Sequence, residues 1–200
     1  MYFRALFISF LLIGSACAAS VRPEVLQLAK QAYKKVQKER PLTRYLSIID
    51  FELPSSQPRF FIYDMAKDEV LLSTHSSHGR ASGHKYAKSF SNQLQSYQSS
   101  LGVFQTGQTY QGKHGLSLKL HGLEPTFNDN AFKRNIVIHG AKYLSKPFIQ
   151  ARGYAGRSHG CPAVDTKVAH KVIELIKGGS LVFAYYPDAT WLSSSRFLNT

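Results

Sequence analysis

Only one cysteine, Cys161, is expected to remain once the N-terminal segment of this chain is removed. The other cysteine, Cys17, follows one positive charge at Arg4 and an apolar run over residues 5–13, and small residues surround it. This pattern is typical of a secretory signal peptide, and the run is too short to span a membrane. Cleavage near Ala18 would leave a single thiol, so no intrachain disulfide can hold the fold. We predict a signal peptide over residues 1–19 and an exported protein of the periplasm or cell envelope. Lipidation at Cys17 stays open, because the usual upstream leucine is missing.

A lone thiol in an exported protein is either a small core side chain or a group kept for its reactivity. Cys161 stands between Gly160, which permits a tight turn, and Pro162, which fixes the chain just beyond it. The segment therefore predicts a bend that presents a side chain, and a bend makes a poor core strand. We expect the thiol to be activated and to react with alkylating agents at neutral pH faster than a free thiol.

An activated thiol needs a nearby base, and histidine is the usual one. The best candidate is His139, which closes the apolar run 136–138 and is followed by Gly140. That pattern predicts an imidazole at the end of a buried strand. The alternative for His139 is a hydrogen-bonded structural histidine.

His139 and the block Ser158-His159-Gly160-Cys161, separated by eighteen residues, together resemble the signature of the murein L,D-transpeptidase (YkuD-type) catalytic domain. The resemblance covers roughly residues 45–186 and is strongest to the branch with Ser-x-Gly-Cys-Pro-Ala. One position departs from the common pattern, because Ala163 stands where most members carry Asn or Arg.

The resemblance implies an enzyme in which Cys161 attacks the carbonyl of the third residue of a peptidoglycan stem tetrapeptide and expels the terminal D-alanine as a thioester forms. His139 would take the thiol proton and return it to the leaving amine. Backbone amides around Gly160 and Cys161 would stabilise the oxyanion. Ser158 and His159 would be supports, the latter mainly through its carbonyl, which helps to orient the base. The same resemblance suggests substrate-binding roles for Ser99, Ser100, His121 and Arg134.

Other classes of protein are less well supported by the sequence. No short metal-ligand pair such as His-Glu-x-x-His is present, so we expect neither a metal nor a cofactor. Nothing around Cys161 resembles the papain-type sequence. A non-catalytic cell-wall-binding module remains the alternative, and an intact His139 and Cys161 argue against it. Five of the histidines precede a glycine, a pattern that we interpret as strand ends and turns around a pocket: His78, His114, His121, His139 and His159.

The hydrophobic pattern predicts a single mainly β core with helical additions. An amphipathic helix is expected over residues 23–40 and one C-terminal helix between Asp165 and Gly178. The serine-rich stretch 73–100 is expected to be a substrate-facing loop, or else a mobile linker. The resemblance sharpens the fold to an L,D-transpeptidase-like β-sandwich, with an N-terminal helical segment over 20–44 and a catalytic domain over 45–200. Strands are predicted over residues 42–53, 59–63, 69–74, 116–120, 136–139 and 180–186.

The formal net charge of +13 limits the kinds of partner that the protein is expected to bind. A strongly positive surface concentrates polyanions. An exported chain would rarely meet nucleic acid, and no nucleic-acid motif is visible, so we expect none as a partner. Peptidoglycan stem peptides and an anionic wall or membrane surface are the partners expected. The sequence leaves the acyl acceptor open between a stem-peptide amine, a protein lysine and water.

Overall fold

The structure is a computed structural model that describes residues 20–199. The predicted signal peptide, with Cys17, lies outside these residues. Eight strands form one mixed sheet in the order β3-β2-β1-β8-β4-β5-β6-β7, with parallel pairs at β1–β8 and β6–β7. The strands are β1 Tyr45–Asp50, β2 Phe60–Asp64, β3 Glu69–Thr74, β4 Gly102–Gly112, β5 Gly115–Gly122, β6 Val137–Ala141, β7 Val164–Asp165 and β8 Leu181–Tyr185.

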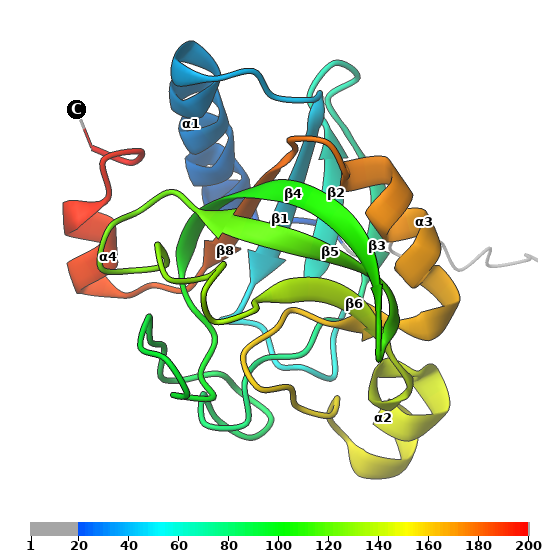
Figure 1. Cartoon of the computed structure of the whole chain (residues 1–200). Helices are drawn as coiled ribbons and strands as arrows, with labels where there is room; N and C mark the ends of the chain where they lie inside the picture. Colours follow the sequence, from blue (N-terminus) through cyan, green and yellow to red (C-terminus); the bar gives the residue numbers. More distant parts are fainter. Residues whose placement is uncertain (1–19, 200) are drawn as a thin grey trace, which may run out of the picture.

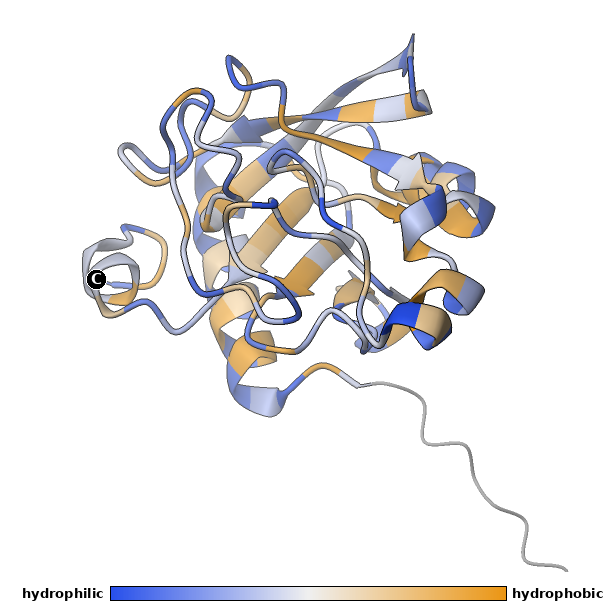
Figure 2. Ribbon diagram, turned by 90° about the horizontal axis from the view of Figure 1, so that it is seen from below, coloured by the Kyte–Doolittle hydropathy of each residue, from blue (hydrophilic) through white to orange (hydrophobic). Residues whose placement is uncertain are grey.

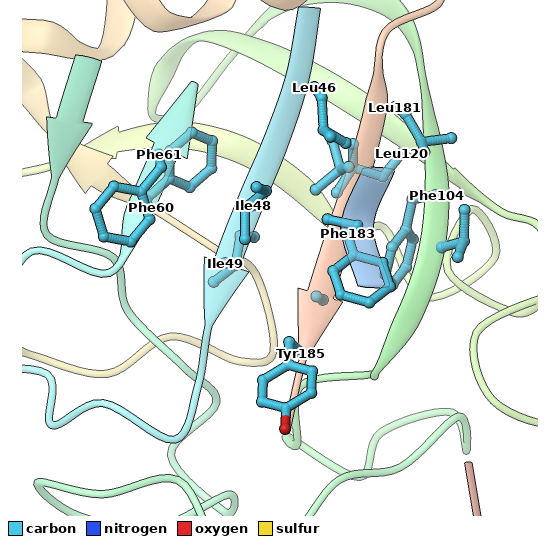
Figure 3. Packing of buried hydrophobic residues seen from close by; sticks show 14 of the residues in the cluster. Leu46, Ile48, Ile49, Phe60, Phe61, Phe104, Leu120, Leu181, Phe183 and Tyr185 are labelled. Atoms are coloured by element: carbon cyan, nitrogen blue, oxygen red, sulfur yellow. The ribbon is translucent and has the colours of Figure 1, made fainter. Parts of the chain in front are cut away.

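The sheet is strongly curved, so that its two halves share one core. Figure 1 shows β4 as a long strand that bends across the rest of the sheet. Side chains from β1, β4, β5 and β8, such as Ile48, Phe104, Leu120 and Phe183, belong to one buried cluster and lie close together in Figure 3. In Figure 2 hydrophobic residues gather on the central strands and hydrophilic residues follow the surrounding loops. The mainly β prediction is confirmed, and the sandwich takes the form of one continuous curved sheet.

Within residues 20–199, four α-helices and one short 3-10 helix surround the sheet. The amphipathic helix is confirmed as α1, whose buried face packs against β1 and β8. The predicted C-terminal helix is α3, which packs against β6; the Asp165 carboxylate caps it by accepting from the Lys167 amide at 3.0 Å. No described helix is long and apolar enough to cross a membrane. The helices are α1 Pro23–Glu39, η1 Lys142–Leu144, α2 Lys146–Arg152, α3 Thr166–Ile176 and α4 Ala189–Ser194.

The prediction of a single C-terminal helix was incomplete, because α2 and α4 were missed, and the longest strand, β4, was missed as well. Strand β4 carries glycines at both ends and at Gly107, with a register shift between Thr106 and Thr109 where it pairs with β5. Its side chains therefore show no clean alternation, and pairing with β5 and β8 forms the strand instead. Helix α4 has only six residues and is capped by Asp188, whose side chain accepts from the Trp191 amide.

Candidate active site

The cysteine-bearing turn is closed by its own serine. The Ser158 hydroxyl accepts from the Gly160 amide at 3.0 Å and donates to the Cys161 carbonyl at 2.7 Å. Gly160 has a φ of 124°, and a Cβ there would lie 2.7 Å from the Gln98 carbonyl, so only glycine fits. The Cys161 thiol lies 3.5 Å from the carbonyl of Asn135. The sequence prediction of a sharp bend that presents the cysteine is confirmed.

A short segment before residue 80 supports this turn from behind. The Ser77 hydroxyl donates to the Cys161 carbonyl and accepts from the Ala163 amide, both at 3.0 Å. The Ser77 amide donates to the Ala163 carbonyl, and the Ser158 amide donates to the His78 carbonyl at 2.9 Å. Ala163 is fully buried. Its backbone amide and carbonyl make the polar contacts at this position, where most family members carry a polar side chain.

A buried arginine lies behind the supporting segment. Arg59 is fully buried and donates to the carbonyls of Ser76 and Leu53 at 2.9 and 3.0 Å, and its Nη2 lies 2.7 Å from Nδ1 of His78. Burial lowers the pKa of His78 to about 3 and the pKa of Arg59 to about 9, so at neutral pH the imidazole is neutral and accepts from a charged guanidinium. No carboxylate among residues 20–199 forms an ion pair with Arg59. The charge is satisfied by neutral acceptors, and two of them, on Ser76 and His78, belong to the segment that supports the cysteine turn.

The cysteine and the predicted base line the same cavity, which has a volume of about 620 Å³. No Asp or Glu of the described chain contributes to its wall. The cavity is lined by Tyr110, Gly112, Lys113, His114, Ser117, Arg134, Asn135, Val137, His139, Tyr143, Arg157, Ser158, His159 and Cys161.

His139 lies on β6 and is 3% exposed. Its Nδ1 lies 3.0 Å from the Gly140 carbonyl. Because a carbonyl only accepts, Nδ1 carries the hydrogen and Nε2 is left with the lone pair that a base needs. The ring of His114, from the β4–β5 turn, stacks on His139 with centroids 4.4 Å apart and planes at 20°. The carbonyl of Gly140 therefore orients the base. The family resemblance had suggested the carbonyl of His159 for this role.

Burial shifts the two titrating groups in opposite directions. It raises the pKa of the Cys161 thiol, although a backbone hydrogen bond at Val137 and the charges of Arg134 and Lys113 act against this shift. Burial also lowers the pKa of His139, and the nearby His114 and Lys113 add to that effect. Both shifts favour a neutral thiol and a neutral imidazole in this cavity over a thiolate–imidazolium pair. The proton would then move only when the thiol attacks.

This electrostatic arrangement reverses our sequence-based expectation for alkylation. Since a raised pKa lowers the thiolate fraction, Cys161 should react with iodoacetamide at pH 7 more slowly than a free thiol, with a rate inflection above the ordinary value of about 8.5. Lys113→Met should move the inflection further up, because that charge favours the thiolate. The pH dependence of the alkylation rate measures both. An inflection below that of a free thiol would instead indicate a preformed ion pair.

Arg134 reaches the cavity but also holds the serine-rich loop. Its guanidinium donates to the carbonyls of Ser91 and Gln98. It also donates to the hydroxyl of Ser100 and, at 3.0 Å, to the hydroxyl of Ser96. Burial lowers the pKa of Arg134, and the proximity of Cys161 opposes this shift. Arg134 thus ties the loop to the cavity wall beside the thiol.

Three residues that were predicted to bind substrate do not line the cavity. Ser99 is buried, and its hydroxyl donates to the Gly160 carbonyl at 3.1 Å. Ser100 is also buried and donates to the carbonyl of Ser91. His121 lies on an exposed position of β5 and stacks on Phe132 at 5.0 Å. The two serines support the walls of the site, so our assignment of direct substrate contact to Ser99 and Ser100 needs correction, whereas His121 lies on the sheet outside the cavity. Part of the serine-rich stretch also packs against the turn, because the Arg80 amide donates to the Ser158 carbonyl at 2.8 Å.

Lys113 and Tyr143 line the cavity and were not predicted, whereas His114 was expected at a strand end or turn around a pocket. His114 and Lys113 come from the β4–β5 turn, and their place in the site follows from a strand that the sequence did not reveal. Tyr143 lies four residues after His139, and burial raises its pKa to about 12, so that it stays a hydrogen-bond donor at neutral pH. His159, which was predicted, is exposed and contacts Tyr97 edge-on at 4.9 Å. No group of three His, Cys, Asp or Glu side chains suited to a metal occurs in the described residues.

A thiol on a rigid turn and a buried imidazole that line one cavity on a mainly β scaffold define a candidate cysteine-dependent active site. A family comparison matches residues 17–185 to the L,D-transpeptidase catalytic domain. The chain belongs to that family, and so to a class of enzymes.

Solved structures with a similar arrangement include two L,D-transpeptidases. One, from Mycobacterium smegmatis, is 13% identical with a TM-score of 0.46, over 72% of this chain and 59% of that chain. Another, from Xylanimonas cellulosilytica, is 15% identical with a TM-score of 0.40, over 83% of this chain and 95% of that one. The match thus spans less than two thirds of the first protein. No curated protein matches the chain in sequence.

Proposed function

We propose that this protein is an exported cysteine acyltransferase that acts on peptidoglycan stem peptides through a thioester on Cys161. The observation that carries the proposal is the placement of Cys161 and His139 on one cavity, with Nδ1 of His139 held by a carbonyl. A base with a fixed tautomer beside a thiol on a rigid turn is what acyl transfer requires. Membership of the L,D-transpeptidase family supports the choice of substrate.

In the proposed reaction, Sγ of Cys161 attacks the carbonyl of the third stem residue and its proton passes to Nε2 of His139. His139 then gives the proton to the amine of the departing D-alanine, and a thioester remains. An amine or water attacks the thioester and restores the thiol. The Gly160 amide is already used by Ser158, whereas the Cys161 amide has no acceptor among residues 20–199, so we assign the oxyanion to the Cys161 amide.

The charge of the cavity supports an acidic donor substrate. Lys113, Arg134 and Arg157 line it, and no carboxylate among the described residues balances them there. A stem tetrapeptide ends in a carboxylate and carries further carboxylates along its length. Such a substrate would neutralise positive charge that the protein itself leaves uncompensated.

The test is to incubate the mature protein with purified muropeptides and to identify the products by mass. Release of D-alanine with a new cross-link would indicate transfer to an amine, and release without a cross-link would indicate hydrolysis. Unchanged muropeptides, with retained binding to sacculi, would contradict the proposal and favour the wall-binding alternative.

Export is part of the proposal, because stem peptides lie outside the cytoplasm. We expect residues 1–18 or 1–19 to be removed. Intact-mass analysis of the protein recovered from the cell envelope checks this. A retained leader would contradict the prediction, and a diacylglycerol adduct on Cys17 would replace it with a lipid-anchored form.

We also propose that the basic face of α1 holds the enzyme on anionic wall or membrane material. Lys30 is paired with Asp68, whereas Lys34 and Lys38 form no ion pair with any described residue. Binding to sacculi should weaken between low salt and about 0.5 M, where the Debye length is roughly 4 Å. Lys34→Gln with Lys38→Gln should flatten this salt dependence in a pelleting assay. Unchanged binding across the salt range would show that contacts in the cavity dominate.

A further inference from the structure

A row of side chains crosses the outer face of the sheet beside the cavity. Tyr110 on β4 pairs with Ser117 on β5, and Ser117 pairs with His139 on β6. Neighbouring strands lie about 4.8 Å apart, so Tyr110 lies about 10 Å from the position of the base, measured across the strands. Tyr110 also lines the cavity. The reacting pair and this exposed tyrosine therefore share one continuous surface.

The row continues along β5. Lys119 and His121 alternate with Leu118 and Leu120, which are buried in the core, so they lie on the same face of the strand as Ser117. Residues 117 to 121 extend this face by about 13 Å along the strand. It leads away from the cavity.

Phe132 completes the surface. Its ring stacks on His121 with centroids 5.0 Å apart and planes at 14°. The Lys119 ammonium lies 4.8 Å from the Phe132 ring and 5.7 Å from the Tyr110 ring, and so bridges them. We call Tyr110, Lys119, His121 and Phe132 the aromatic strip.

The aromatic strip leaves large apolar area in contact with solvent. Tyr110 is 40% exposed and Phe132 is 47% exposed. The backbone of each residue is fixed: that of Tyr110 by the β4–β5 pairing, and that of Phe132 in a turn where its carbonyl accepts from the Asn135 amide at 3.1 Å. Exposed aromatic rings beside a cavity are typical of a binding surface.

We propose that the aromatic strip binds the glycan strand, a β-1,4-linked chain of N-acetylhexosamines, while the attached stem peptide occupies the cavity. Sugar rings present C–H faces that stack on flat aromatic rings, and such contacts need no charge on the ligand. The inference rests on the proposed function, in which three stem residues separate the sugar from the bond that breaks. Three extended residues span about 10–11 Å, which matches the distance from the base across to Tyr110.

The direct test compares two donors that differ only in the sugar. For Phe132→Ala, the ratio of kcat/KM for a disaccharide-tetrapeptide to kcat/KM for the free tetrapeptide should fall about tenfold. Tyr86→Ala is the matched control: Tyr86 is also 47% exposed, carries the Lys85 ammonium 5.9 Å from its ring and does not line the cavity. That variant should keep the wild-type ratio. Circular dichroism melting verifies that both variants are folded.

A binding experiment tests the aromatic strip without any turnover. The binding of a chitooligosaccharide tetramer to the protein can be monitored by NMR. The tetramer should shift the signals of Lys119 and His121, and Phe132→Ala should abolish these shifts. If the wild type binds no tetramer, or if Phe132→Ala slows both donors equally, the glycan assignment is wrong. Tetramer binding by a protein that processes neither donor would instead contradict the proposed function and leave the aromatic strip supported.

Discussion

Replacing Cys161 or His139 by alanine is expected to abolish turnover of muropeptides, by a factor of about 10³ or more for each variant. The double variant should be scarcely slower than either single variant, because the thiol and its base act as one unit and each is ineffective without the other. Single-turnover release of D-alanine, measured for the wild type and the three variants, checks this.

The control for this experiment is His170→Ala, which removes an exposed histidine of α3 that does not line the cavity. It should retain the wild-type rate. All variants should remain folded, because Cys161 supports no part of the main apolar cluster. If the losses of the two single variants multiply in the double variant, the residues act independently and the proposed pair is wrong.

Arg59→Met is expected to lower the free energy of unfolding by roughly 3 kcal/mol, since two buried acceptors and one partly buried acceptor lose their donor. The same variant should slow acylation, because the Ser76–His78 segment that Arg59 holds also supports the cysteine turn. Arg59→Lys should recover part of both losses, because an ammonium can serve some of the same acceptors. Urea unfolding measures the first effect.

A merely structural role for Arg59 would lower stability without moving the chemistry of the site. The pH dependence of Cys161 alkylation separates the two, because a displaced turn changes the burial of the thiol and therefore its pKa. An Arg59→Met protein with wild-type stability, or with lowered stability but an unchanged alkylation profile, would contradict the positioning role.

The parts of the fold that the sequence predicted are those with strong local signals. Helix α1 shows apolar spacing behind Pro23, and α3 shows the same spacing behind the cap at Asp165. Strand β5 alternates between core and outer face. By contrast, β4 owes its conformation to its neighbours in the sheet, because its own sequence is rich in glycine and polar residues. Tertiary pairing overrode weak local propensity there.

The candidate site divides in the same way. The sequence predicted the thiol, the bend and the base because each has a recognisable local pattern, at Cys161, Gly160 and His139. The structure brings these residues to one place. The stacking of His114 on His139 could not be predicted, because His114 reaches the base only through the turn after β4. Ser99 shows the reverse error, in which a residue close to the site in space was assigned a contact with substrate when its hydroxyl in fact holds the Gly160 carbonyl.

The most direct test of the account is the intact mass of the protein during reaction with a stem tetrapeptide donor. The wild type should gain the mass of the tripeptide acyl group, which peptide mapping should place on Cys161. The gain should be absent in Cys161→Ala and strongly slowed in His139→Ala. An acyl group on another residue, or release of D-alanine by Cys161→Ala at the wild-type rate, would contradict the assignment of Cys161 as the nucleophile.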